Sequence, residues 1–454
     1  MSPNWFHRLK RSRHILPGSE RRRNGGDALL GLLRGYAASE RLDAAGLAER
    51  QRQHLFPLAK HCAGQSPHFS RRLKAAGLSP EDLAEPGGLA KLPPLTRREL
   101  VEARDSFFCR VTPKGHGAVK SNSTSGSTGE PVTVRRTGLC DLHWLTYTLR
   151  EHLWHDRDFA GRLAASRFSI TEPVSAPGWG PPCDMVLRTG PSSAMPVTKS
   201  VEELSDWLLE FDPHYLLVMP STLAALVSYF DSAGHRPDAL RGVRTFGETI
   251  TPHLREDVLR VLRSGVADIY SSQEGGVMAT QCPEEGTYHV SETIILEVVD
   301  AEGRACQPGE VGRILVTDLV NSASPLIRYE IGDYAEVGTP CPCGRGLPTI
   351  KRFLGRERNL VILPDGTRHW PLVGFFHWDE VFPVAQFQFV QLDRQTVLAR
   401  MSAADSPTPE QEARLTAIIR ESLGHPFEIR YQWQTEPLER GPSGKFEEFI
   451  CKAE

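Results

Sequence analysis

Hydrophobic residues recur with helical spacing over much of residues 27–75. The segments ALLGLLRGYAA and LAERQRQHLFPLAKHC place apolar side chains three or four positions apart, which gathers them on one face of a helix. A turn-rich segment, LAEPGGLAKLPPLTRREL, follows, and Thr96 is placed to cap a helix that begins at Arg97. We therefore expect helices over much of 27–75 and a further helix from Arg97.

The middle of the chain alternates between short apolar runs and amphipathic segments. Ser200 precedes Glu203 by three residues in KSVEELSDWLLEF, a capping-box pattern at a helix start. HYLLVMP is typical of a buried strand and STLAALVSYF of a helix, while GVRTF and GVADIY are expected strands on either side of a helix in PHLREDVLRVLRSG. This alternation predicts a parallel sheet in an α/β layered domain.

The pattern changes after about residue 286 and again after about residue 355. VSETIILEVVD and GRILVTDLV are extended, with the turn-rich AEGRACQPGEVG between them. Further on, QFQFVQLDRQTVLARMSA predicts two strands, TPEQEARLTAIIRESLG a helix and FEIRYQWQ a strand. The expected fold class is α/β plus α+β, with a large N-terminal domain of layered sheets and helices (31–354) and a small C-terminal α+β domain (355–454).

Composition and charge narrow the class of protein. The 454 residues are 40% hydrophobic and 24% charged, with a net charge of −3, which is ordinary for a globular protein with a large core and two or more domains. The balanced charge argues against nucleic acid as an obligatory partner. No run of about 18 apolar residues occurs, so no membrane span is expected.

The first 30 residues and the cysteines indicate where in the cell the protein is expected. The segment MSPNWFHRLKRSRHILPGSERRRNGG is basic and lacks the long apolar core of a secretory signal. We expect residues 1–30 to form a basic, partly disordered arm, with a transit peptide or a partner-binding arm as alternatives. The nine cysteines are odd in number and mostly scattered, which argues against a disulfide framework and favours a cytoplasmic location.

One polar segment, STSGSTGEPV at residues 123–132, has no hydrophobic face. Glycine-rich turns let successive backbone N–H groups converge on an anion, and serine and threonine add hydroxyl donors. The segment is therefore suited to phosphate, although it lacks the lysine of the Walker A pattern. Taken alone, it is more typical of a polar hairpin or linker.

The segment TSGSTGEP resembles the phosphate-binding motif of the adenylate-forming enzymes, the superfamily of acyl-CoA synthetases, luciferases and peptide-synthetase adenylation domains. Five further resemblances to motifs of that superfamily follow in the family's order: FGE at Phe246–Glu248, IYSSQE at Ile269–Glu274, LIRYEIGDYAEV at Leu326–Val337, GRERN at Gly355–Asn359 and GPSGKFEE at Gly441–Glu448. The segments LPPLTRREL and CPCGRGLP resemble the phenylacetate–CoA ligase and capsule-type branch. The resemblance spans nearly the whole chain after the first 30 or so residues.

The resemblance implies ATP-dependent activation of a carboxylic acid to an acyl-adenylate, followed by transfer to a thiol. The implied cofactors are ATP and Mg²⁺, and coenzyme A is the acceptor that the branch favours. The acid is expected to be aromatic or another small organic acid, and the C-terminal domain to be a mobile lid. An amine or a carrier-protein thiol as acceptor, and a nucleotide-binding pseudoenzyme, remain alternatives.

The resemblance also implies roles for individual residues. Lys445 would stabilise charge in the transition state, Glu274 would hold Mg²⁺, and Arg358 would be the hinge. Asp333 would bind the ribose with help from Arg356. The other implied nucleotide contacts are Thr124, Ser125, Gly126, Ser127, Thr128, Gly129, Gly247, Glu248, Tyr270 and Ser271, of which Tyr270 would stack on adenine.

The chain departs from the family pattern at three positions. Ser271 stands where the family usually has glycine, Gln273 replaces a hydroxyl residue, and Arg358 replaces an aspartate or lysine. Each implied role also has an ordinary structural alternative. These are a surface carboxylate for Glu274, a turn cap for Asp333, a surface charge for Lys445 and a core position for Tyr270.

Four residues could bind a metal ion. CPEEGTYH supplies Cys282 and His289, and CPCGRG supplies Cys341 and Cys343. Three cysteines and one histidine are a valid tetrahedral set for structural Zn²⁺, although Cys-x-Cys is tighter than the usual spacing. Buried free thiols or a redox pair are the alternatives, and the remaining cysteines are expected to be small buried hydrophobes.

The sequence also suggests where the acid lies. We expect its pocket to be built partly from residues 140–180, including FSITEPVSAPGWGPP, in which Trp179 could shape the wall.

Overall fold

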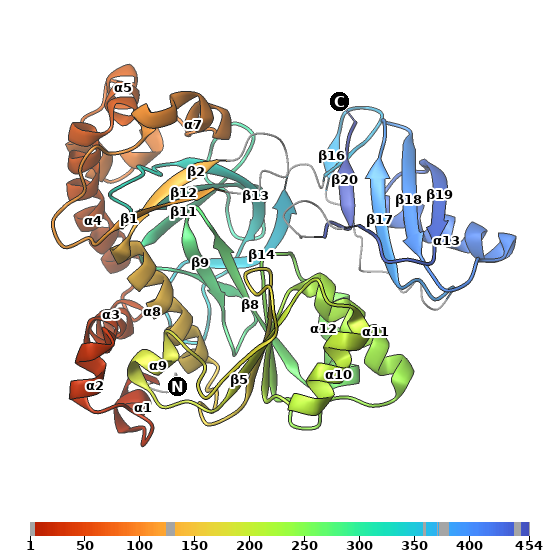
Figure 1. Cartoon of the computed structure of the whole chain (residues 1–454). Coiled ribbons are helices and arrows are strands. Elements are labelled where there is room, and N and C mark those ends of the chain that lie inside the picture. The colour runs from red at the N-terminus through yellow and green to blue at the C-terminus, as the bar shows by residue number, and fades with distance from the viewer. Residues whose placement is uncertain are drawn as a thin grey trace. The chain divides into compact units, whose positions relative to one another are not determined.

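The computed structural model describes residues 5–123, 132–356, 360–369, 371, 381–439 and 446–453. The chain divides into two units, drawn with their elements labelled in Figure 1. The first unit contains residues 1–161, 176–191 and 269–353, and the second contains 162–175, 192–268 and 354–454.

The beginning of the first unit is ordered helix, which corrects the expectation of a partly disordered arm. Residues 5–30 carry α1 (Trp5–Arg11), α2 (Gly18–Arg23) and the start of α3 (Gly26–Ser39). Trp5 is only 2% exposed, and its indole Nε1 donates a 2.7 Å hydrogen bond to Glu40 Oε1. The apolar residues scattered between the basic ones bury one face of this segment, which its charge alone does not reveal.

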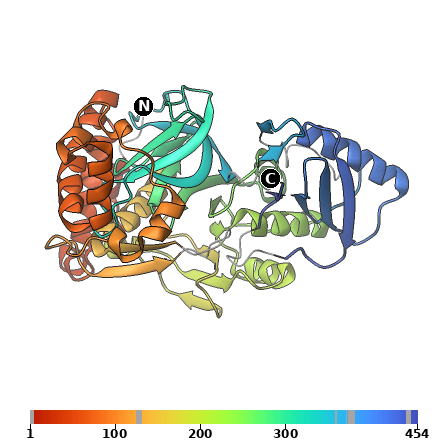
Figure 2. The same cartoon turned by 90° about the horizontal axis from the view of Figure 1, so that it is seen from above.

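The predicted helices over residues 27–75 are confirmed as α3, α4 (Ala44–Gln65) and α5 (Pro67–Ala76). They are followed by the short helices α6 (Pro80–Ala84) and α7 (Arg97–Ala103), and the hydroxyl of Thr96 accepts from Glu99 N as predicted. The red-to-orange N-terminal helices stand side by side in Figure 2. A turn of 3₁₀ helix, Leu89–Lys91, lies between α6 and α7, and another, Arg104–Phe107, follows α7.

An antiparallel sheet forms the core of the first unit. Its strand order is β11-β12-β13-β14-β10-β9-β8. The bounds are β8 (Gly265–Ser272), β9 (Gly276–Gln281), β10 (Tyr288–Val290), β11 (Ile294–Val299), β12 (Val311–Asp318), β13 (Tyr329–Val337) and β14 (Thr349–Arg356). The division between the units falls inside β8, and β14 runs past the break after Phe353.

Helix α8 (Gly138–Trp154) packs against this part of the fold and carries a buried ion pair. Thr137 caps the helix through Cys140 N, and the hairpin of β1 (Val119–Ser123) and β2 (Thr133–Thr137) precedes it. Arg150 NH1 donates to both carboxylate oxygens of Glu292, at 2.7 and 2.8 Å. Further along the chain, α9 (Cys183–Val186) completes the helices of the unit.

The second unit holds the predicted parallel sheet, with strand order β8-β7-β6-β3-β5-β4. The pairs β3/β5, β3/β6 and β6/β7 are parallel, which confirms the sequence prediction. The bounds are β3 (Leu163–Arg167), β4 (Val174–Ala176), β5 (Ser192–Pro196), β6 (Tyr215–Val218) and β7 (Gly242–Phe246).

Helices of the second unit bury their apolar faces against this sheet. The capping box of Ser200 and Glu203 begins α10 (Val201–Phe211), as predicted, and α11 (Pro220–Ala233) ends at a left-handed Gly234. The expected helix at residues 252–265 is α12 (Pro252–Asp257) continued by one π-helical turn, Val258–Leu262.

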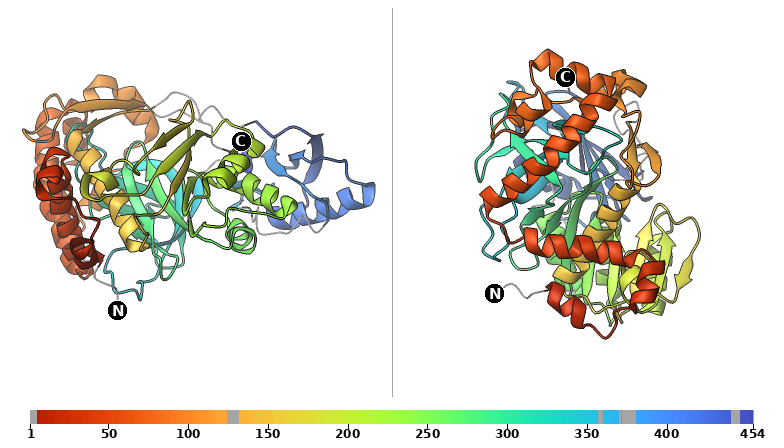
Figure 3. Two further views of the ribbon diagram at one scale, coloured as in Figure 1. Left: turned by 60° about the horizontal axis from the view of Figure 1, so that its bottom comes forward. Right: turned by 90° about the vertical axis from the view of Figure 1, so that its left-hand side faces the viewer.

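The C-terminal residues contain a small sheet with its own core. Its order is β19-β18-β17-β20, and α13 (Pro409–Leu423) lies along one face, seen in blue in the left panel of Figure 3. The bounds are β15 (Val361–Ile362), β16 (Arg368–His369), β17 (Gln386–Gln391), β18 (Thr396–Ser402), β19 (Glu428–Gln434) and β20 (Phe449–Cys451). Phe389, Leu415 and Phe449 are among the buried residues that join helix and sheet. The two strands, helix and strand expected after residue 386 are thus confirmed.

Within the described part of the chain, none of the helices combines the length and the apolar character that crossing a membrane requires.

Candidate active site

Three of the predicted elements lie outside the described residues. The phosphate segment, with Thr124, Ser125, Gly126, Ser127, Thr128 and Gly129, is one of them, and Arg358 and Lys445 are the others. The structure does describe the two paired strands on either side of the phosphate segment, β1 and β2. Ser123 pairs with Thr133, and their side-chain hydroxyls lie 3.0 Å apart. The roles of the loop, the hinge and the lysine stay predictions.

Two predicted nucleotide residues meet in the first unit. The hydroxyl of Tyr270, on β8, donates a 2.7 Å hydrogen bond to Oδ2 of Asp333, on β13. The Tyr270 ring stacks on Phe353, with ring centroids 3.8 Å apart and an interplanar angle of 15°. One face of the tyrosine is therefore covered by Phe353, a residue that the sequence gave no reason to select. Ser271 follows Tyr270 at an irregularity in the pairing of β8 with β9.

Glu274 is buried rather than on the surface, at 5% exposure. Its backbone carbonyl accepts a 3.0 Å hydrogen bond from Arg136 NH1. Its carboxylate makes no hydrogen bond or ion pair with any of the residues that the structure describes. A buried carboxylate requires compensation by a proton, a donor or a cation, so the Glu274 carboxylate could hold a metal ion. Burial argues against the surface alternative for this residue.

Three other predicted residues belong to the second unit. Gly247 has φ +82°, a left-handed conformation that favours glycine. The Glu248 carboxylate accepts a 2.8 Å hydrogen bond from Ser221 N, in the first turn of α11, which holds the FGE segment against that helix. Arg356 is the last residue of β14.

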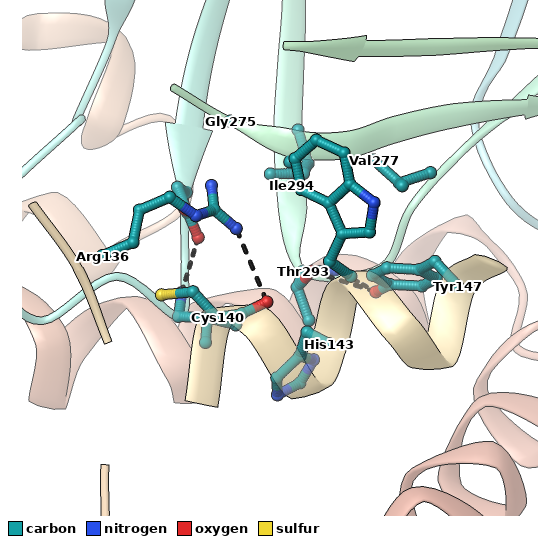
Figure 4. Close-up of a pocket in the computed structure, with 12 residues that line it drawn as sticks. Arg136, Cys140, His143, Tyr147, Gly275, Val277, Thr293 and Ile294 are labelled. Atoms are coloured by element: carbon teal, nitrogen blue, oxygen red, sulfur yellow. Dashed lines mark hydrogen bonds between the residues drawn. The ribbon is translucent and has the colours of Figure 1, made fainter. Parts of the chain in front are cut away.

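A small cavity lies in the first unit, and its empty space of about 260 Å³ includes open solvent. One wall is Gly275, Gly276 and Val277, which directly follow Glu274 in the chain. The facing wall is Thr293 and Ile294 with Asp318 and Val320, at the paired ends of β11 and β12. Figure 4 shows Cys140, His143 and Tyr147 contributed by α8, with Arg136 beside them, and Trp144 also lines the cavity.

The acid pocket expected from residues 140–180 stays a prediction, although some of those residues line this cavity. Its α8 residues fall inside the predicted range 140–180. Trp179, however, is not part of the lining. Its indole donates to Gly161 O at 2.9 Å and its ring packs on Phe159, so it is a core residue here.

Burial sets the charge of the cavity lining. It raises the pKa of the Asp318 carboxyl, against the opposing effect of the Arg136 charge. Burial also raises the pKa of the Cys140 thiol to about 11 and lowers that of His143 to about 4. The thiol and the imidazole are thus uncharged at neutral pH.

The four predicted metal ligands are brought together. Cys282 and His289 lie at β9–β10, and Cys341 and Cys343 lie between β13 and β14, with all ligand atoms within 4.8 Å of one another. The Sγ atoms of Cys282 and Cys341 are 3.8 Å apart, and Cys343 Sγ is 3.3 Å from His289 Nε2. A tetrahedral zinc ion with bonds of about 2.3 Å to sulfur and about 2.0 Å to nitrogen separates two sulfur ligands by about 3.8 Å and a sulfur from a nitrogen by about 3.5 Å.

This cluster could therefore bind a metal ion. Burial raises the pKa of Cys341 to about 12 and that of Cys282 above its ordinary value, so without a cation the thiols stay protonated. Of the remaining cysteines, Cys62, Cys109, Cys140 and Cys183 are buried as expected, whereas Cys306 and Cys451 are partly exposed.

Comparison with known proteins gives distant relatives along most of the chain. Phenylacetate-coenzyme A ligase of Escherichia coli is 26% identical over 337 residues, covering 69% of this chain and 72% of the relative. The ligase of the same name from Thermus thermophilus is 25% identical over 337 residues. Protein CapK of Staphylococcus aureus is 27% identical over 117 residues, a quarter of this chain. No family model matches the chain.

Solved structures show the same fold at lower identity. A 2-hydroxyisobutyryl-CoA ligase in a postadenylation state superimposes with a TM-score of 0.71 at 16% identity, covering 91% of each chain. An anthranilate CoA ligase superimposes with a TM-score of 0.53 over 72% of this chain and 65% of that one. The shared fold is a large mixed α/β N-terminal domain followed by a small C-terminal α/β domain. Fold and sequence together make this chain a member of the adenylate-forming ligase superfamily, distantly homologous to the phenylacetate-coenzyme A ligases and to CapK.

Proposed function

We propose that the chain is an AMP-forming acid–thiol ligase that activates a small carboxylic acid and transfers it to coenzyme A. The observation that carries the proposal is the position of Glu274. It is a buried carboxylate without a partner among the described residues, and it directly precedes a wall of the cavity. A carboxylate in that position can hold a cation beside the end of the cavity at which a reacting acid would lie.

The first step joins two anions. An oxygen of the acid attacks the α-phosphorus of ATP, the bond to the bridging oxygen breaks, and pyrophosphate leaves. Glu274 would hold Mg²⁺, which neutralises charge on the phosphate oxygens when bound. Residues 124–129 would supply backbone and hydroxyl donors to the β- and γ-phosphates. Lys445 would place its ammonium between the acid and the α-phosphate.

The nucleoside part of ATP would be held by the motif residues. Asp333 would accept hydrogen bonds from the ribose hydroxyls, and its bond with Tyr270 fixes the carboxylate for that role. Tyr270 would present the ring face opposite Phe353 to adenine. The remaining proposed nucleotide contacts are Gly247, Glu248, Ser271 and Arg356.

The second step needs a nucleophile on the activated acyl carbon. The thiol sulfur of coenzyme A would attack that carbon, lose its proton, and release AMP. Rotation of the C-terminal domain about Arg358 would first carry Lys445 away from the site. Coenzyme A is favoured over an amine because the relatives that match most of the chain are named coenzyme A ligases.

The cysteine–histidine cluster would hold a structural Zn²⁺. Four protein ligands would hold the ion, Cys282, His289, Cys341 and Cys343, which would leave no open position for catalysis. The ion would tie the turn after β9 to the segment between β13 and β14. That segment leads into β14, which carries Phe353.

Acid-dependent ATP–pyrophosphate exchange with a panel of acids tests the first step. We expect exchange with at least one small acid, and its loss in Lys445→Ala by about two to three orders of magnitude. Lys452→Ala is the matched control, because Lys452 is another C-terminal lysine, exposed and outside the motif. ATP binding without exchange for any acid would contradict the proposal and favour a pseudoenzyme.

The acceptor is identified by product analysis. Coenzyme A, a panel of amines and a carrier protein are offered separately, and the acyl product of each reaction is measured by mass spectrometry. Acyl transfer only to an amine or a carrier protein would overturn the choice of coenzyme A.

A further inference from the structure

Arg345 is a buried arginine beside the cysteine–histidine cluster. It lies in the same loop as Cys341 and Cys343, between β13 and β14, and is 5% exposed. Its Nη1 donates to the sulfur of Cys282 at 3.8 Å and lies 3.7 Å from Oε1 of Glu284. The Glu284 side chain is 41% exposed, so water screens that ion pair. Within the described residues, this guanidinium has no ion pair with a buried carboxylate.

A buried guanidinium needs an anion close to it. Arginine stays protonated in proteins, and removing its charge from water is costly unless a partner compensates it. Neutral thiols do not supply that compensation. Zn²⁺ bound by three thiolates and one neutral imidazole carries one net negative charge, because each thiol loses its proton when it binds the metal. The position of Arg345 therefore favours a metal-bound cluster over buried free thiols.

The guanidinium of Arg345 also lies over the ring of Trp154, the last residue of α8. Its Cζ is 4.3 Å from the ring centroid, and the Cζ of Arg150 lies over the same side chain at 4.5 Å. Trp154 is 4% exposed, and its Nε1 donates a 3.2 Å hydrogen bond to Oε2 of Glu40. The other carboxylate oxygen of Glu40 accepts from the indole of Trp5. Trp154 thus connects the surroundings of the cluster to the segment that carries α1 and α3.

The loop that carries the cluster contacts the same segment through its backbone. Gly346 N donates a 2.8 Å hydrogen bond to the carbonyl of Glu40, which follows α3 directly. A Cβ at position 346 would lie 1.8 Å from the carbonyl oxygen of Leu42, so glycine is required where the loop passes the end of that helix. The loop is therefore packed against the end of α3 independently of the contact through Trp154.

We propose that Arg345 compensates the charge of the metal-bound cluster, and that metal binding thereby stabilises the docking of the N-terminal segment, residues 5–43. The inference rests on the structural zinc of the proposed function and is independent of the acid and its acceptor. Arg345 is a positioning residue, since it acts through the cluster and binds no metal itself. Loss of the metal frees the loop and removes the charge partner of Arg345. The contacts of this loop with Glu40 and Trp154 are then weakened.

The affinity for zinc tests the role of Arg345. The zinc-loaded full-length chain is titrated with a chelator of known affinity, and the Kd for Zn²⁺ is compared between wild type, Arg345→Gln and Arg345→Lys. Arg345→Gln removes the charge and is expected to raise the Kd about 10- to 100-fold. Arg345→Lys keeps the charge and is expected to recover part of that loss. Arg72→Gln is the matched control and should keep the wild-type Kd, because Arg72 is a largely buried arginine that bonds the carbonyls of Ile327 and Pro93.

Amide hydrogen exchange tests the coupling to the N-terminal segment. Exchange is measured by mass spectrometry in peptides from residues 5–43 of wild type, with zinc bound and after treatment with the chelator. Peptides from α13, in the C-terminal sheet, are the internal reference. Removal of zinc is expected to raise the exchange rate of residues 5–43 about tenfold or more and to leave α13 unchanged. This measurement does not require any variant to fold.

The outcomes separate this inference from acid activation, because no readout uses the reaction. A Kd that is unchanged in Arg345→Gln, or raised equally in Arg72→Gln, overturns the role of Arg345. Zinc release that leaves exchange in residues 5–43 unchanged, or that raises it equally in α13, overturns the coupling. A wild-type chain that binds no zinc overturns the whole inference, whether or not ATP–pyrophosphate exchange is observed.

Discussion

The hydroxyl of Tyr270 and the carboxylate of Asp333 are joined by a 2.7 Å hydrogen bond across 63 residues of sequence. Both were singled out by resemblance to separate motifs, one proposed to face adenine and the other ribose. This hydrogen bond fixes the position of Asp333 Oδ2 and the orientation of the Tyr270 side chain relative to each other. Because Phe353 lies against one face of the ring, the pair is also packed in place, which lowers the cost of ordering it around a nucleotide.

Removing that hydrogen bond should weaken nucleotide binding without dismantling the fold. We expect Tyr270→Phe to raise the KM for ATP about 3- to 10-fold in the exchange assay, because the ring is kept and only Asp333 loses a donor. Asp333→Ala should raise it further. Tyr431→Phe serves as control, since that hydroxyl contacts Thr416 in the C-terminal segment. A KM for ATP that is unchanged in both site variants would contradict the assignment.

The metal cluster makes a prediction that does not depend on activity. Purified protein should contain about one equivalent of zinc, and Cys341→Ser should contain less than about a tenth, because a serine hydroxyl is a poor ligand for this ion. We also expect a lower melting temperature for Cys341→Ser and for chelator-treated protein. Cys306→Ser, at a partly exposed cysteine outside the cluster, should retain the zinc. Zinc-free wild-type protein with an unchanged melting temperature would leave the cluster as free thiols.

Local signals account for the parts of the fold that were predicted correctly. The caps of α7 and α10 depend on hydrogen bonds within four residues, and the apolar periodicity of α13 lies within one segment. The parallel strands were recognisable because strand and helix patterns alternate. Each of these features depends on residues that are close together in the sequence. They can therefore be predicted without knowing which distant segments are in contact.

Features that depend on distant contacts were missed. Trp5 is buried and its indole donates to Glu40, 35 residues away, whereas the arginines and lysines around it favour a disordered arm. Phe353 and Asp318 belong to no motif, and only the pairing of strands brings them to Tyr270 and to the cavity. The candidate metal ligands were predicted although they are distant in sequence, because two closely spaced cysteines and a Cys–His pair are each a local pattern typical of metal ligands.

Breaking the buried ion pair of Arg150 and Glu292 should strongly lower the free energy of unfolding. Their side chains are 1% and 3% exposed, so Glu292→Gln leaves the arginine charge uncompensated and should cost about 3–5 kcal/mol in urea unfolding. The double variant Arg150→Met with Glu292→Leu should recover much of that loss. The exposed pair of Arg260 and Asp231, at 56% and 50%, gives the contrast, and Asp231→Asn should cost less than about 1 kcal/mol. Equal costs for the two single substitutions would contradict this account.

His143 should make the protein lose stability as the pH falls below about 6.5. Burial, and then the charges of His54, Arg136 and His116, lower the pKa of His143 to about 4, against about 6.5 in an unfolded chain. Between those values the unfolded state binds a proton that the native state does not, so the free energy of unfolding rises with pH through this window.

The slope from His143 is about 1.4 kcal/mol per pH unit, which amounts to at most about 3 kcal/mol by pH 4. His143→Gln cannot titrate and keeps a polar group near the Tyr36 hydroxyl, which bonds His143 Nδ1 in the native protein. We therefore expect a shallower fall in urea stability between pH 6.5 and 4 for His143→Gln than for wild type. His235→Gln, at an exposed histidine, should follow the wild-type curve, and parallel curves for all three proteins would show that His143 binds its proton equally well in both states.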